Sequence, residues 1–378
     1  MGRGRRLVAL VVLVVVTALA SGCSPMLPAT ALDPEGVAML AKARATGIAS
    51  ADPFALDDAS KRTLENQVGR FGSAQERIER LLRWIQRGDE GFVHDAERTV
   101  DAQTAFASRR GGCVSHSLLV VSAARFLGVD AFMLHARSAP QYLERSDALL
   151  ALTHVAVGWQ DATVTQLVDV WIPHDQWRLV EYERLDDRAA LALYYGNLAV
   201  ADLRAGRLDE AESTLRFLVR EAPDVAEVRA NLVATLLRRH DYVAALGEAR
   251  EGVAHFPRFS AFYTNGYLAA MACDDDVAAR DFATRGNDLA QVDPIFLYVR
   301  GVRELRDGNG AGAARAFEGA LAINADSVLL RAWLVRARLS AGDEAGAAVT
   351  FAEARKLAPD DMRLRELADR YPTLGQRR

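Results

Sequence analysis

The fold of the first half of the chain is decided by the stretch Arg109-Arg110-Gly111-Gly112-Cys113-Val114-Ser115-His116-Ser117. Two adjacent glycines allow the backbone to turn sharply before the cysteine. Residues 118–127 then form an apolar run at roughly helical spacing, and Gly128 suits the position just past a helix end. The stretch predicts a helix with Cys113 in its first turn, where backbone N–H groups and the helix dipole stabilise a thiolate. Because buried cysteines are also common packing residues, that alternative stays open here.

Two strand patterns further along the chain carry a histidine and an aspartate. Residues 153–159 and 166–171 alternate between apolar and polar side chains, and the short polar gap between them predicts a hairpin. A two-residue turn at Asp161-Ala162 would place His154 directly opposite Asp169, on one face and within hydrogen-bonding distance.

The three side chains form a combination suited to nucleophilic catalysis. In such an arrangement Cys113 attacks, His154 takes the thiol proton, and Asp169 orients and stabilises the imidazolium. The sequence therefore predicts a catalytic site made of Cys113, His154 and Asp169.

Four short motifs resemble the core of the transglutaminase-like superfamily: R-x-G-G-C-x-S-x-S-x-L, A-A-R-F-L-G-V-D-A, H-V-A-V and V-D-V, in this order within residues 64–173. The resemblance implies a papain-like fold with Cys113 as nucleophile, His154 as base and Asp169 as the group that orients it. Bacterial relatives usually have asparagine where Gly112 stands. The oxyanion-hole side chain of the family is not identifiable here, and the backbone N–H of Cys113 is one expected donor.

The surrounding segments predict an α+β domain over residues 33–188. Residues 33–71 carry two helical patterns, and residues 73–87 form a clearer helix that Ser73 caps with Glu76 three residues later. Residues 129–136 are typical of a strand. The polar segment 137–147 predicts a loop near the site, where substrate selection would take place.

The other candidate groups favour structural roles. His116, His174 and Asp175 lie close in sequence to the predicted site, but a surface or structural position is expected for each. No spacing of His, Cys, Asp or Glu is typical of a metal site, and no glycine motif suits a phosphate, so we expect neither a metal nor a cofactor. The three cysteines form no disulfide framework, and Cys273 is expected in a helical core.

The N-terminus has the pattern of a targeting segment. Residues 1–22 combine an arginine-rich start, a short apolar run and small residues, which is typical of a signal peptide. The end of this segment resembles a bacterial lipobox, which implies lipidation of Cys23 and a tether over residues 23–32. Ser24 then implies sorting to the outer membrane. The expected location is the bacterial cell envelope, with a lipid anchor on the periplasmic face of the outer membrane. Ordinary signal cleavage, with Cys23 incidental, is the alternative.

The overall composition excludes one class of partner. The chain of 378 residues is 50% hydrophobic and 25% charged, with a net charge of −4. This balance is typical of a globular protein and gives no electrostatic basis for nucleic-acid binding.

The second half of the chain repeats. Pro223 and Pro257 stand 34 residues apart, and a set of alanines keeps the same phase: Ala211, Ala245, Ala279, Ala313 and Ala347. A 34-residue period of paired helices resembles the tetratricopeptide repeat (TPR). We expect an all-α solenoid of about five repeats over residues 189–361, followed by a capping helix and tail over residues 362–378.

Such arrays usually bind a protein or peptide partner along their concave face. The resemblance implies that first-helix residues line this face, and they are mostly small or apolar: Leu193, Gly196, Val200, Ala230, Ala234, Ala261, Thr264, Leu268, Tyr298, Val302 and Ala332. They also suit packing against the first domain or another element. Partner binding and internal packing therefore both stay open.

Two functions follow from these patterns. In the first, the α+β domain is a cysteine protease, an amidase or a transglutaminase-like acyltransferase, and the repeats bind a partner. In the second, the domain is catalytically inactive, and the chain is a scaffold that organises an envelope protein complex.

Overall fold

The computed structural model describes residues 32–49, 51–87, 91–145, 148–161, 164–169, 181–289 and 294–375. The predicted signal peptide, the lipidation site Cys23, His174 and Asp175 lie outside them. The chain divides into two compact units, Met1–Pro140 with Thr153–Val228, and Gln141–Leu152 with Arg229–Arg378. Among the described residues, no helix combines the length and the apolar character that crossing a membrane requires.

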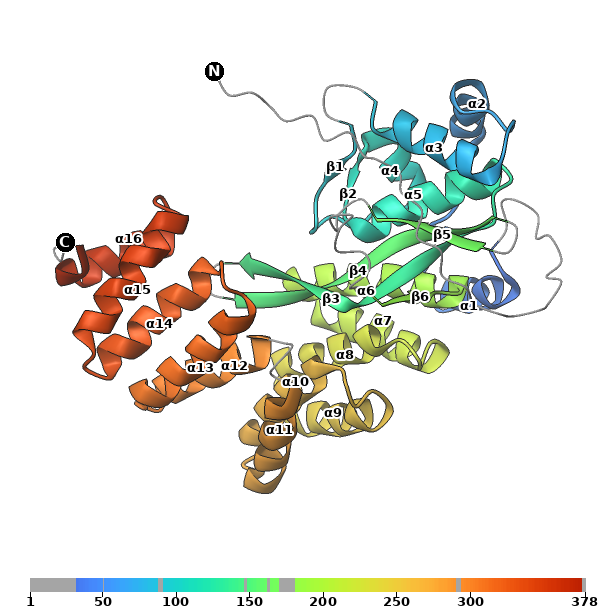
Figure 1. Cartoon of the computed structure of the whole chain (residues 1–378). Helices are drawn as coiled ribbons and strands as arrows, with labels where there is room; N and C mark the ends of the chain where they lie inside the picture. Colours follow the sequence, from blue (N-terminus) through green and yellow to red (C-terminus); the bar gives the residue numbers. More distant parts are fainter. Residues whose placement is uncertain are drawn as a thin grey trace, which may run out of the picture. The chain divides into compact units, whose positions relative to one another are not determined.

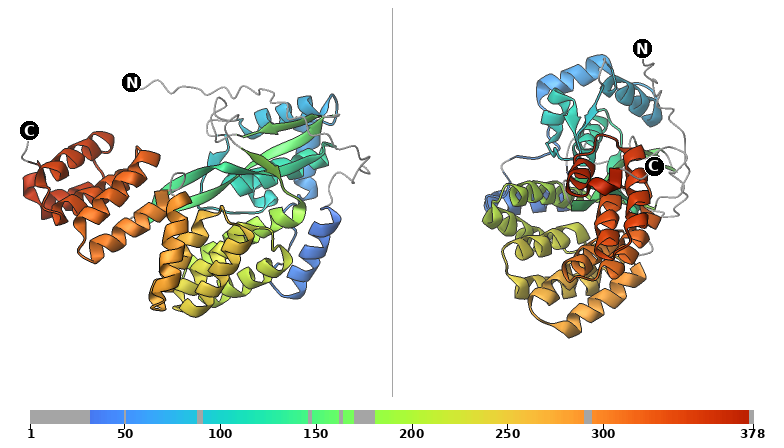
Figure 2. Two further views of the ribbon diagram at one scale, coloured as in Figure 1. Left: turned by 60° about the horizontal axis from the view of Figure 1, so that its bottom comes forward. Right: turned by 90° about the vertical axis from the view of Figure 1, so that its left-hand side faces the viewer.

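The first unit is built on a sheet with the strand order β5-β4-β3-β6. Its described elements, in chain order, are α1 (Pro34–Ala45), α2 (Asp58–Gln67), α3 (Ala74–Ile85), β1 (Val93–His94), α4 (Ala102–Ser108), β2 (Arg110–Gly111), α5 (Cys113–Phe126), β3 (Ala131–Arg145), β4 (Ala148–Asp161), β5 (Val164–Val168), β6 (Tyr182–Arg184), α6 (Asp187–Arg204) and α7 (Leu208–Glu221). Figures 1 and 2 show α5 on one side of this sheet and α6 on the other. A small α+β region is therefore present, as predicted.

Helix α5 is the centre of this unit. Nearly all of its residues are buried, including the apolar residues Leu118, Val121 and Ala124. The chain leaves the helix through Gly128, whose φ of +80° belongs to the left-handed region that glycine favours. Helix α3 begins with the predicted capping box between Ser73 and Glu76.

The loop predicted for residues 137–147 is wrong over residues 137–145, and residues 146–147 lie outside the described residues. Strand β3 runs from Ala131 to Arg145 and is hydrogen-bonded to β4. The polar composition suggested a connecting segment, but polarity indicates exposure and says nothing about backbone pairing. A strand whose N–H and C=O groups are paired with a neighbour can therefore continue through polar residues.

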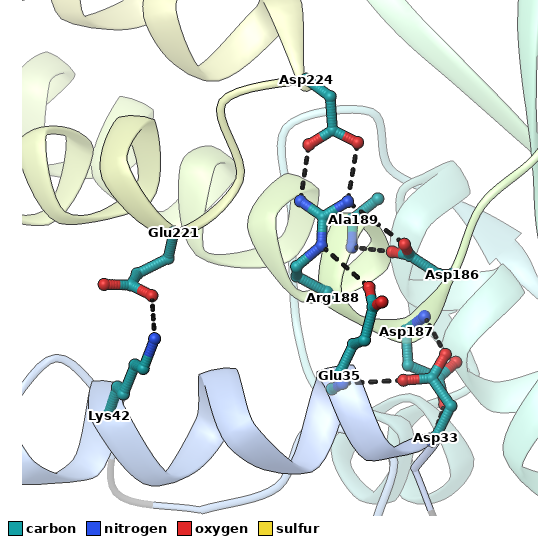
Figure 3. A network of polar contacts seen from close by, with 10 residues as sticks. Asp33, Glu35, Lys42, Asp186, Asp187, Arg188, Ala189, Glu221 and Asp224 are labelled. Atoms are coloured by element: carbon teal, nitrogen blue, oxygen red, sulfur yellow. Dashed lines mark hydrogen bonds and ion pairs between the residues drawn. The ribbon is translucent and has the colours of Figure 1, made fainter.

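Helices α6 and α7, which form the first helix pair of the repeat region, are tied to α1 by a polar network (Figure 3). The backbone N–H groups of Asp33 and Asp187 donate reciprocally to each other's carboxylates, at 2.8 and 2.9 Å. Arg125 donates two hydrogen bonds to Asp187, each 2.8 Å long. Lys42 also pairs with Glu221 at 2.6 Å. These contacts fix α1, α5 and α6 against one another.

Beyond α7 the described residues form further helices, and from α9 to α16 each helix contacts the next (Figure 2). Those described are α8 (Ala226–Arg238), α9 (Tyr242–His255), α10 (Ser260–Ala272), α11 (Asp276–Leu289), α12 (Pro294–Arg306), α13 (Gly310–Ile323), α14 (Val328–Ser340), α15 (Glu344–Leu357), α16 (Met362–Arg370) and the 3₁₀ turn η2 (Pro372–Gly375). From α7 to α15, alternate helices begin 34 residues apart. The predicted helix pairs and their period are confirmed.

Small residues set the spacing between these helices. The five alanines that share one phase, from Ala211 to Ala347, are buried. A Cβ atom on Gly301 would lie 2.7 Å from the ring of Phe317, so only glycine lets α12 and α13 approach this closely.

Part of the predicted concave face is internal. Tyr298 is buried, and its ring packs against those of Phe317 and Trp333. The other buried members of the predicted set are Leu193, Gly196, Ala230, Thr264 and Ala332. These six residues contribute to internal packing. For them the structure favours internal packing over partner binding.

Candidate active site

The backbone before α5 is held in place by a short parallel strand pair. Val93 and His94 of β1 lie in register with Arg110 and Gly111 of β2. The N–H of Asp95 donates to the carbonyl of Gly111 at 3.0 Å, and that of Gly112 donates to the carbonyl of Arg98 at 2.7 Å. Cys113 follows as the first residue of α5 and is partly exposed. The predicted position of Cys113 in the first helical turn is confirmed.

Close neighbours crowd both glycines, and the tighter contact is at Gly111. A Cβ atom on Gly111 would lie 2.6 Å from Cβ of Ser115, and one on Gly112 would lie 3.2 Å from the carbonyl oxygen of Asp95. Gly112 has an extended backbone and precedes the helix without a side-chain cap. Glycine thus stands in place of the family's asparagine where the backbone of Asp95 passes close to residue 112. Helix α5 still begins normally at the next residue.

His154 and Asp169 are in direct contact. Nε2 of His154 lies 2.6 Å from Oδ2 of Asp169, and both side chains are almost fully buried. His154 is on β4, and Asp169 directly follows the last residue of β5. The sheet thus brings together two of the three predicted site residues.

The predicted register of this hairpin is wrong by two residues. Asp161 pairs with Val164, and Val157 pairs with Val168, so the turn falls one residue later than Asp161-Ala162. The same register, continued by one residue, sets Asp169 opposite Ala156 and diagonal to His154. A shift of two residues keeps both side chains on one face, because strand side chains alternate with a period of two.

His154 also has a hydrogen bond with Cys113, which raises its pKa. Burial alone would lower the pKa of His154, but the hydrogen bonds and charges of Asp169 and Cys113 outweigh it and raise the pKa to about 9. The imidazole therefore carries a proton at neutral pH and bridges the thiol and the carboxylate.

A fourth side chain of the site, Tyr182, has no signal in the sequence pattern. Its hydroxyl donates to Oδ2 of Asp169 at 2.9 Å, from strand β6 at the other edge of the sheet. Burial and the negative charge of Asp169 raise the pKa of Tyr182, so the phenol remains a donor. The contact depends on the pairing of β6 with β3, which no local pattern reveals.

Two more histidines lie near the site. His116 is buried, with its ring edge-on to that of Phe92 at 4.8 Å. Burial and the charge of His94 lower its pKa to about 4, so His116 is neutral at physiological pH and fills a structural position. Burial and the charge on His154 also lower the pKa of His94.

The arrangement is suited to thiol chemistry. In the described part of the chain, no three His, Cys, Asp or Glu side chains converge as metal ligands would, and Cys113 and Cys273 are not in a disulfide. A thiol at a helix N-terminus, hydrogen-bonded to a protonated imidazole that a buried carboxylate holds, has the components of a nucleophile and its acid–base partner.

No protein-family model matches this chain, and no curated protein sequence matches it. Solved helical-repeat structures do resemble it. A thermophilic TPR protein of Thermus thermophilus has 24% identity and a TM-score of 0.36, over 47% of this chain and 95% of its own. MamA of Desulfovibrio magneticus has 18% identity and a TM-score of 0.35, over 47% of this chain and 98% of its own. The helix pairs and their 34-residue period, seen in the structure itself, make this region a TPR-like solenoid.

Proposed function

We propose that the first unit is a cysteine-dependent acyl-transfer or amide-hydrolysing enzyme with a transglutaminase-like site. The observation that carries this proposal is the continuous contact from Cys113 through His154 to Asp169, in which His154 lies 2.6 Å from the carboxylate. Cys113 is the nucleophile, His154 is the acid–base group, and Asp169 is the positioning residue.

The proposed reaction begins with a thiolate–imidazolium pair. The Cys113 sulfur attacks the carbonyl carbon of an amide, and the electron pair of the C=O bond moves to the oxygen. The backbone N–H of Cys113, at the start of α5, is a donor for this oxyanion. As the tetrahedral intermediate collapses, the C–N bond breaks and His154 gives its proton to the leaving amine, which leaves a thioester on Cys113.

The fate of the thioester separates the two activities. His154, now neutral, takes a proton from water or from an incoming amine as that group attacks the thioester. Water produces a carboxylic acid, as in a protease or amidase. An amine produces a new amide, as in a transglutaminase. Both reactions use the same side chains, so the site supports either one.

The TPR-like solenoid supports a role in protein–protein interaction. Repeats of this kind commonly present an extended surface to a protein or peptide. A binding scaffold with an inactive first unit is therefore the second candidate. The two differ in a simple test, because replacing Cys113 with alanine abolishes the function of an enzyme and leaves a scaffold active.

The location we propose is the cell envelope, with Cys23 as the lipidated residue. This part of the proposal rests on the N-terminal sequence pattern alone. It makes envelope proteins or peptides the expected substrates. A mass spectrum of the mature N-terminal peptide from membranes tests it, and an unmodified Cys23 would refute the anchor.

Alkylation by iodoacetamide tests the proposed nucleophile. At pH 6.5 we expect Cys113 to react at least about tenfold faster than Cys273, which serves as an internal control in the same chain. His154→Ala should remove this difference and leave the rate of Cys273 unchanged, with the fold checked by circular dichroism. Equal rates for the two cysteines in the unaltered protein would contradict the proposal.

A further inference from the structure

The oxygen of Asp169 that contacts His154 has a second hydrogen-bond donor. Oδ2 accepts from Nε2 of His154 at 2.6 Å and from the hydroxyl of Tyr182 at 2.9 Å. The two donors come from different strands, β4 and β6. The position and the charge of this oxygen therefore depend on both groups.

Tyr182 reaches the carboxylate across an intervening strand. Strand β3 lies between β4 and β6, and Ala136 of β3 is the register partner of Tyr182. Register partners present their side chains on the same face. At the register position of Tyr182, strand β3 presents the small side chain of Ala136, which is buried.

We infer that Tyr182 is a positioning residue of the proposed nucleophile site: its hydroxyl fixes the Asp169 oxygen that holds the His154 imidazole. This inference rests on the proposed function. It adds to the site a residue of β6, the next described strand after β5.

The hydroxyl of Tyr182 affects the charge of the Asp169 carboxylate as well as its position. A donor to a carboxylate stabilises its negative charge and takes a share of it, so less of that charge acts on the imidazolium. Within the residues that the structure describes, Cys113 and His116 of α5 and His94 of β1 also act on His154 or on this carboxylate through their charges. None of these changes when the phenol oxygen of Tyr182 is removed.

The test is the titration of His154 in full-length protein labelled with ¹³C at Cε1 of histidine. The chain has seven histidines, and His154→Ala assigns the resonance. In Tyr182→Phe we expect the pKa of His154 to rise by about 0.5–1 unit, because Asp169 then concentrates its charge on the imidazolium. The matched control is Tyr195→Phe, which removes a hydroxyl that donates to the carbonyl of Ala51 and does not contact Asp169.

A second variant tests the same contact in case Tyr182→Phe does not fold. Ala136→Val crowds the path of the ring, keeps the hydroxyl, and should move the pKa of His154 in the same direction. An unchanged or lowered pKa in folded Tyr182→Phe would overturn the inference, even where alkylation shows Cys113 to be activated. If Cys113 instead reacts like Cys273 while the shift occurs, the enzyme proposal fails and the positioning contact stands.

Discussion

At the residue scale, the central feature is one imidazole between a thiol and a carboxylate. The buried position of His154 disfavours its charged form, and the two neighbours more than offset this, so that its pKa is about 9. Neither neighbour alone defines the site. Asp169 holds the ring through Nε2, and Cys113 forms a hydrogen bond with the same imidazole.

The first prediction concerns the contribution of Cys113 to this balance. Cys113→Ala removes the hydrogen bond and the electrostatic interaction with Cys113 that favour the imidazolium, whereas burial and Asp169 are unchanged. The pKa of His154 should therefore fall from about 9, by roughly one unit. The measurement is an imidazole NMR titration of both proteins. A pKa that stays the same would mean that the thiol and the imidazole do not interact.

At the element scale, the first helix pair is part of the unit that carries the site. Asp187, the first residue of α6, accepts a hydrogen bond from Arg125 of α5. It also accepts one from the backbone N–H of Asp33, which caps α1 (Figure 3). This carboxylate is buried, whereas the Lys42–Glu221 pair between α1 and α7 is more exposed. Burial should make the two contacts very unequal in energy.

Alanine substitutions measure this inequality. Asp187→Ala leaves the Arg125 guanidinium without its carboxylate and should lower the free energy of unfolding by about 3 kcal/mol. Lys42→Ala breaks an exposed pair and should lower it by less than about 1 kcal/mol. Urea denaturation of the two variants provides the comparison. Equal losses would show that the buried network does not hold α1 and α6 together.

Local signals in the sequence predicted most of these elements. The glycine pair predicted the start of α5, Ser73 and Glu76 predicted the start of α3, and the alternation around His154 predicted β4. The hairpin register was missed because it depends on whether the turn begins at residue 161 or 162, and the polar flanks permit both. Tyr182 was missed because its contact depends on pairing between strands that are distant in sequence.

At the scale of the whole molecule, two kinds of structure share one chain. The sheet of the first unit carries a buried polar site, whereas the helices from α7 to α15 repeat with a 34-residue period. The period could be predicted because alanines recur every 34 residues along the repeats. The burial of Tyr298 and its neighbours could not, because it depends on how successive helices pack.

The central claim is that Cys113, His154 and Asp169 act together on an acyl group. Acylation of the full-length protein by p-nitrophenyl acetate tests it most directly, with the acetylated cysteine identified by mass spectrometry over time. We expect rapid acetylation of Cys113 with release of p-nitrophenolate, slow regeneration of the thiol by water, and loss of both steps in His154→Ala. Acetylation of Cys113 no faster than that of Cys273, and independent of His154, would contradict it.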